Sequence, residues 1–102
     1  MSNRSHTPPW WGYAKSMIRR YHTGNLTQRE RDAVNRAIEE TGGLPDGEMR
    51  LKLIDAVFWA QTHTLVGAAL KLNICDRVAR KWHGQFIHKV GISYGLEYLR
   101  IK

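Results

Sequence analysis

The stretch THTLVGAALKLNICDRVARKWHGQF, residues 62–86, contains two helical patterns separated by a short break at LNIC. The first pattern starts at Thr64, a good helix cap, and carries Ala68 and Ala69 midway, where a second helix can cross closely. The break holds Asn73, one of the few residues besides glycine that tolerates a left-handed backbone. The stretch therefore predicts either a helix-turn-helix that inserts its second helix into DNA or an ordinary helical hairpin.

The break also sets the start of the second helix, which we expect to run from about Cys75 to Val90. Ile74 is apolar and follows the turn residue, so it should fill the space between the two helices. Cys75 stands where Ser or Thr is preferred, and the helix start is therefore weakly capped. Asp76 in the first turn suits the positive end of the helix dipole.

Apolar residues in the second helix separate an inner from an outer face. Ala79, Trp82 and Phe86 recur at helical spacing and predict the inner face. The residues left on the outer face are Asp76, Arg77, Arg80, Lys81 and Gly84. Arginine can donate two hydrogen bonds to a guanine edge, and lysine can contact guanine or phosphate. The outer face therefore suits the major groove, which the N-terminal half of a recognition helix enters.

A longer stretch, RLKLIDAVFWAQTHTLVGAALKLNICDRVARKWHGQFIHKVG at residues 50–91, resembles the C-terminal part of RinA-type and ArpU-type phage transcriptional regulators. The segment WWGYAKSMIRRY at residues 10–21 resembles the opening helix of the same proteins. The resemblance implies a late-gene activator of phage or prophage origin. It also implies a helix-turn-helix similar to region 4 of sigma factors, the region that reads promoter DNA.

The resemblance also implies roles for individual residues, carried over by position. The predicted base contacts are made by Asp76, Arg77, Arg80 and Lys81. Thr64 would cap the first motif helix and meet a phosphate. His83 neighbours the same face, and we expect it to be a surface or phosphate contact.

The charge distribution agrees with a polyanionic partner. The chain has 102 residues, a formal charge of +7 and a pI of about 10.0. Residues 1–22 hold four Lys or Arg and no acid, and residues 64–102 hold seven against two acids. Residues 23–63 are acidic, with seven acids against five bases. Basic ends around an acidic middle are consistent with double-stranded DNA as the partner, although ordinary surface scatter would look similar.

The remaining sequence predicts a small all-α domain of about five helices without strands. We assign residues 1–24 to an N-terminal basic helix, acting as an arm or a packing helix. Residues 25–102 form a helical domain that contains the helix-turn-helix at about 64–90. Within it, Thr27 and Glu30 form a capping box, and the pair Gly42 and Gly43 is expected to end that helix in a left-handed conformation. A tail of weak pattern follows Val90.

Two adjacent tryptophans, Trp10 and Trp11, cannot both face one core from a helix. At least one should be partly exposed, either shielding neighbouring side chains or contacting a partner, because exposed Trp is enriched in interface hot spots. The candidate partners are a second copy of the chain, giving a homodimer, and host RNA polymerase.

Other site chemistries find little support in the sequence. The five histidines and Cys75 lack zinc-ligand spacing, no glycine-rich phosphate loop follows a strand, and no carboxylate pair suggests acid–base catalysis. We therefore expect no metal, no cofactor and no enzymatic activity. A single cysteine, no secretion signal and no apolar run long enough for a membrane span predict a cytoplasmic, nucleoid-associated protein of a bacterial host.

The leading hypothesis is thus a sequence-specific DNA-binding transcriptional regulator. Two alternatives remain open. A phage small terminase subunit also recognises DNA with a helix-turn-helix, but it assembles into rings and usually has long oligomerising helices, which this sequence does not predict. A protein-binding inhibitor would keep the fold without the DNA contact.

Overall fold

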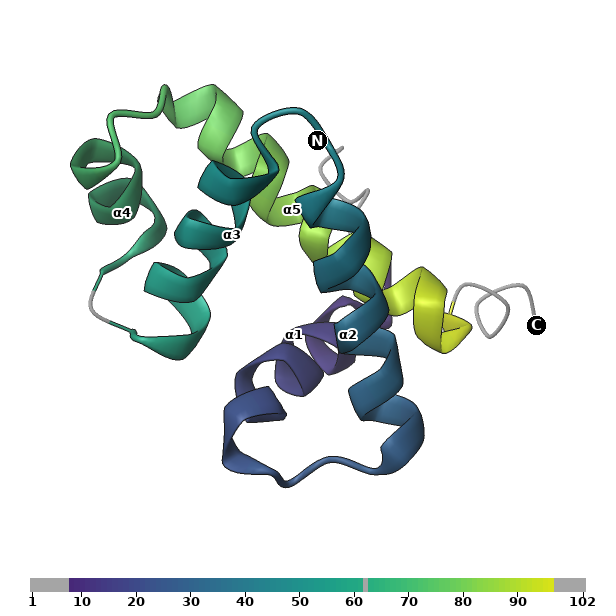
Figure 1. Cartoon of the computed structure of the whole chain (residues 1–102). Helices are drawn as coiled ribbons and strands as arrows, with labels where there is room; N and C mark the ends of the chain where they lie inside the picture. The colour runs from purple at the N-terminus through teal and green to yellow at the C-terminus, as the bar shows by residue number, and fades with distance from the viewer. Residues whose placement is uncertain (1–7, 62, 97–102) are drawn as a thin grey trace.

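The computed structural model describes residues 8–61 and 63–96, and this part of the chain consists of helices joined by turns and short loops, without strands. The five α-helices are α1 (Trp11–Arg20), α2 (Gln28–Gly42), α3 (Gly47–Ile54), α4 (Leu65–Lys71) and α5 (Asp76–Tyr94). A 3₁₀ turn, η2 (Tyr21–Thr23), follows α1, and a π-helical segment, η3 (Asp55–Trp59), continues α3. The predicted all-α domain of about five helices is confirmed (Figure 1).

Helix α2 begins as the sequence predicts and ends differently. The Thr27 hydroxyl accepts a hydrogen bond from the Glu30 amide, and the Glu30 carboxylate accepts one from the Thr27 amide, at 3.2 and 2.9 Å. The capping box is therefore confirmed. Gly43, however, is right-handed with φ −86°, and its amide already bonds to the last carbonyls of α2. The left-handed residue is Asp46, with φ 60°, at the entrance to α3.

The Glu30 carboxylate also ties α1 to α2. The Tyr13 hydroxyl donates a hydrogen bond to Oε2 of this carboxylate, and the Arg20 guanidinium lies 3.5 Å from the same oxygen. Glu30 is buried, with 6 % of its surface exposed. Its pKa lies below the ordinary value because of the Tyr13 hydrogen bond first and the backbone amide of Thr27 second. A buried carboxylate is stable here because hydrogen bonds and a cation replace its water.

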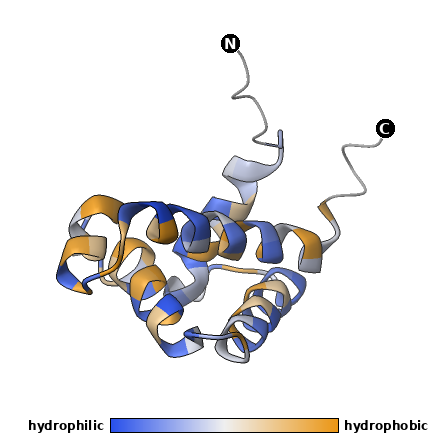
Figure 2. Cartoon of the chain, turned by 90° about the horizontal axis from the view of Figure 1, so that it is seen from above, coloured by the Kyte–Doolittle hydropathy of each residue, from blue (hydrophilic) through white to orange (hydrophobic). Residues whose placement is uncertain are grey.

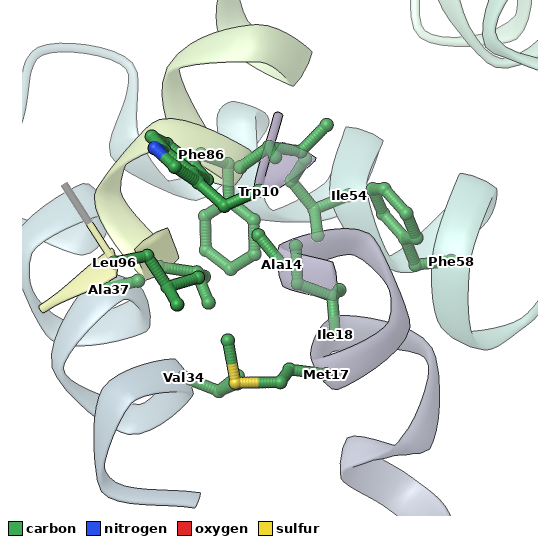
Figure 3. Close-up of a cluster of buried hydrophobic side chains, with 12 residues drawn as sticks. Trp10, Ala14, Met17, Ile18, Val34, Ala37, Ile54, Phe58, Phe86 and Leu96 are labelled. Carbon is green, nitrogen blue, oxygen red and sulfur yellow. The ribbon is translucent and has the colours of Figure 1, made fainter. Parts of the chain in front are cut away.

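Helix α5 is the central element of the fold and packs against α1, α2, α3 and α4. Its residues Phe86, Ile87 and Val90 are buried in the main core. Figure 3 shows that core between the helices, with Met17 of α1 beside Val34 of α2 and with Phe86 and Trp10 close together. A second, smaller cluster lies between α3, α4 and the start of α5, and its buried members are Leu53, Ala68, Ala69 and Ala79.

Gly91 of α5 lies directly against the ring of Trp10. A Cβ atom built on Gly91 would lie 2.2 Å from Cζ3 of that ring. The Trp10 side chain is buried and stacks on His88 at 5.6 Å between ring centroids. Glycine at position 91 therefore lets the chain before α1 lie directly on α5. Within residues 8–61 and 63–96, no helix combines the length and the apolar character that a bilayer crossing requires.

We predict that Gly91→Ala destabilises the protein by about 1–3 kcal/mol, because a rigid buried ring must move to make room. The matched control is Gly84→Ala on the same helix, where the nearest atom, Cη2 of Trp11, would lie 3.8 Å from the new Cβ. That change should stabilise by up to about 1 kcal/mol through helix propensity alone. Urea unfolding of both variants measures the difference, and equal stabilities would contradict the Trp10 contact.

We predict that Glu30→Gln lowers the free energy of unfolding at pH 7 by about 1–3 kcal/mol, because charge-assisted hydrogen bonds are lost. The pKa of Glu30 is depressed in the folded state, so its contribution is present above the ordinary carboxyl pKa and is lost as the pH falls through the folded value. The difference between wild type and variant should therefore shrink in acid. The exposed Glu39, changed to Gln, should show neither effect.

Candidate nucleic-acid interface

Helix α4, the turn after it and the start of α5 have the geometry of a closely packed helical pair. Thr64 caps α4, since its hydroxyl accepts a hydrogen bond from the Gly67 amide at 3.1 Å. Asn73 adopts φ 60°, so the predicted left-handed turn residue is confirmed. The amide of Asn73 bonds to the Leu70 carbonyl at 3.1 Å, and the amide of Ile74 bonds to the Ala69 carbonyl at 2.8 Å. These two bonds form a Schellman motif.

The Schellman motif brings an apolar residue back onto the helix that it terminates. Ile74 is partly buried and packs against the second cluster, which contains Ala68 and Ala69. Ala79 of α5 is fully buried in the same cluster. Small side chains on both helices allow their backbones to approach closely. The predicted roles of the paired alanines and of Ile74 are therefore confirmed.

The predicted inner face of α5 is confirmed at two of its three positions. Ala79 and Phe86 are buried, whereas Trp82 is only partly buried at the edge of the second cluster. The guanidinium of Arg50 on α3 covers the Trp82 ring at 5.1 Å from its centroid. Trp82 therefore packs against the second cluster and under a cation of α3 without being fully buried.

The outer face of α5 presents cations at its N-terminal end. Arg77, Arg80 and Lys81 are all exposed. Arg80 forms a surface ion pair with Asp76 at 2.8 Å, one turn earlier on the same helix. Among the described residues, no carboxylate lies within 4.0 Å of the charged groups of Arg77 or Lys81. Two arginine or lysine side chains are thus available to a ligand, and a third is held along the helix by Asp76.

His83 does not share this exposed face, which corrects the expectation of a simple surface contact. Its ring is partly buried and stacks on Phe58 of η3, with 5.3 Å between centroids and 3° between planes. The buried face of α5 widens here because α1 and η3 pack against it. Burial lowers the pKa of His83, and the positive charges of Lys15 and Arg19 on α1 lower it further.

The two tryptophans take different positions, as predicted. Trp10 is 7 % exposed, so it belongs to the core and offers no surface to a partner, contrary to its inclusion in a candidate interface. Trp11 is partly exposed and lines a groove of about 570 Å³ with Leu44, Arg50, His88 and Ile92. Sequence reasoning did not find this groove, because its sides come from three separate segments of the chain.

Comparison of the chain with protein-family models, with curated protein sequences and with solved structures finds no significant match. In the part of the chain that the structure describes, no three His, Cys, Asp or Glu side chains come together as candidate metal ligands.

A substitution at Cys75 tests where α5 begins. Cys75 is the N-cap residue and its side chain makes no capping hydrogen bond. We predict that Cys75→Ser stabilises the protein by about 0.5–1 kcal/mol, because a serine hydroxyl can accept a bond from a free amide of the first turn. Thermal unfolding should rank Ser above Cys and Ala at this position. Equal stability of the Ser and Ala variants would contradict the assigned N-cap.

Proposed function

We propose that the protein is a sequence-specific DNA-binding transcriptional regulator of phage or prophage origin, and that α5 is its recognition helix. The observation that carries the proposal is the tight α4–turn–α5 unit, whose second helix presents Arg77, Arg80 and Lys81 to solvent. A helix in this position can enter the major groove, and its N-terminal residues then meet base edges.

The arrangement of the molecule supports this proposal. Figure 1 places α4 and the first turns of α5 at one end, away from α1 and α2. The second cluster holds α4 against α5 through small buried side chains. The proposed reading segment is therefore both projecting and rigidly mounted, which a helix needs if its side chains are to distinguish base pairs.

Regulation of late genes and contact with RNA polymerase rest on the resemblance to RinA-type and ArpU-type regulators alone. A binding site near a phage promoter would support that part of the proposal. Selection of bound fragments from phage DNA, followed by footprinting, tests it. Binding without any preferred fragment would contradict sequence-specific regulation.

A second candidate function, protein binding, is favoured by one observation. On helix α4, the side chains of Val66 and Leu70 are 50 % and 78 % exposed, and they lie one turn apart. Figure 2 shows strong hydrophobic colouring in this region of the molecule. On this alternative, the protein would be an inhibitor that binds a partner protein through α4. Absence of DNA binding at low salt, together with loss of inhibitory activity in a Leu70→Ser variant, would favour this protein-binding function.

The recognition helix gives a sharp prediction. Arg77→Ala should weaken binding to the selected site by about 1–3 kcal/mol and relax the preference at one base position. The control is Arg36→Ala, an exposed arginine on α2 that removes the same charge elsewhere. It should weaken specific and random DNA only slightly and alike. Fluorescence anisotropy with both DNAs measures the contrast.

One result would contradict base reading by α5. If Arg77→Ala and Arg80→Ala each weaken binding to specific and random DNA by the same factor, with an unchanged footprint, then α5 contacts phosphates and reads no bases.

A further inference from the structure

Helix α1 places two cations beside the partly buried His83. The guanidinium of Arg19 lies 5.9 Å from the centroid of the Phe58 ring, the same ring on which His83 stacks. Lys15, one turn earlier on α1, also acts electrostatically on His83. Arg19 of α1 and His83 of α5 therefore share the Phe58 ring, and Lys15 is near enough to His83 to act on its charge. We call Lys15, Arg19 and His83 the basic cluster.

The basic cluster lacks negative partners among the residues that the structure describes. The three ion pairs found there join Arg20 to Glu30, Arg80 to Asp76 and Lys89 to Glu40. None involves a member of the basic cluster. Like charges held together without a counter-charge are unfavourable in the free protein, and an anion bound between them would remove that repulsion.

The position of the basic cluster along α5 indicates which anion fits. His83 follows Arg80 by three residues, so their Cβ atoms are about 5–6 Å apart on neighbouring turns. Successive helix residues turn by about 100°, which places Arg80 between His83 and Arg77 around the helix. If Arg77 meets bases, the basic cluster lies at the flank of α5. The sugar–phosphate backbone borders the groove at such a flank.

We propose that Lys15, Arg19 and His83 form a binding site for a backbone phosphate of DNA, and that His83 takes up a proton when the phosphate binds. The inference rests on the proposed function, since it needs α5 in the groove. The phosphate oxygens accept hydrogen bonds from the Arg19 guanidinium, the Lys15 ammonium and the imidazolium of His83. The proton comes from solvent, and no covalent bond forms or breaks.

The direction of the pH effect follows from the groups around His83. On α1, the groups that act on His83 are the cations Lys15 and Arg19, whereas Arg20 and Tyr13 are engaged with Glu30. Asp55 is the one titratable residue of η3, where it is exposed. On α5 itself, Asp76 is engaged by Arg80. In the free protein the pKa of His83 is below its ordinary value, so the ring is neutral at pH 7. A bound phosphate raises that pKa, so affinity is highest in acid and falls as the pH rises through the pKa of the complex.

The deciding experiment is an NMR titration of the His83 ring in the wild-type chain, free and bound to the selected DNA duplex. We expect a higher His83 pKa in the complex. A rise of about one unit corresponds to a tenfold loss of affinity across the titration. An unchanged or lower His83 pKa in a complex that forms normally would overturn the inference and leave DNA binding intact. If no duplex binds, the proposed function fails and the inference fails with it.

Variants and a second anion sharpen the test. His83→Gln should flatten the pH dependence of DNA affinity, whereas His88→Gln, at an exposed histidine on the same helix, should retain it. Lys15→Gln and Arg19→Gln should each weaken binding to specific and random duplexes alike, with a salt slope lower by about one.

A titration of His83 with inorganic phosphate at matched ionic strength is the last comparison. A His83 pKa that rises with phosphate but not with DNA would assign the site to the free anion and overturn the proposal.

Discussion

The burial of α5 is the constraint on which the rest of the structure depends. Its later turns lie in the main core, where Gly91 admits the Trp10 ring and Phe86 belongs to the same buried cluster. Its first turns leave that core and carry exposed cations. Because one continuous helix does both, the position of Arg77 relative to the body of the protein is fixed by contacts made several turns away. Rigid mounting of this kind favours direct reading of base edges over loose electrostatic attachment.

Local signals in the sequence predicted the helix boundaries near the site. Thr27, Thr64 and Asn73 each act through hydrogen bonds or backbone geometry within a few residues of themselves. Caps and left-handed turns are short-range effects, so a pattern of neighbouring residues is enough to identify them. The buried alanines of α4 and α5 were predictable for a related reason, since a tight turn forces two helices to approach closely.

Long-range contacts explain what the sequence did not predict. His83 was expected at the surface, yet α1 and η3 come from distant segments and cover it. Gly43 was expected to be left-handed, but α3 starts so close to α2 that a Cβ on Gly47 would lie 2.5 Å from the Gly42 carbonyl oxygen. The left-handed residue is therefore Asp46. The π-helical turn at η3 and the Glu30–Tyr13 bond likewise depend on partners that no local pattern reveals.

DNA cleavage directed from Cys75 is the most direct test of the central claim that α5 enters the major groove. Cys75 is the single cysteine of the chain, it is exposed, and it is the N-cap of α5. An iron chelate attached to its sulfur would cut any DNA that lies near the start of the helix. The account predicts cleavage at a few adjacent nucleotides inside the protected site, whereas a chelate on Arg36→Cys in a Cys75→Ser background should not cut there. Weak, evenly spread cleavage from Cys75 on a protected site would contradict it.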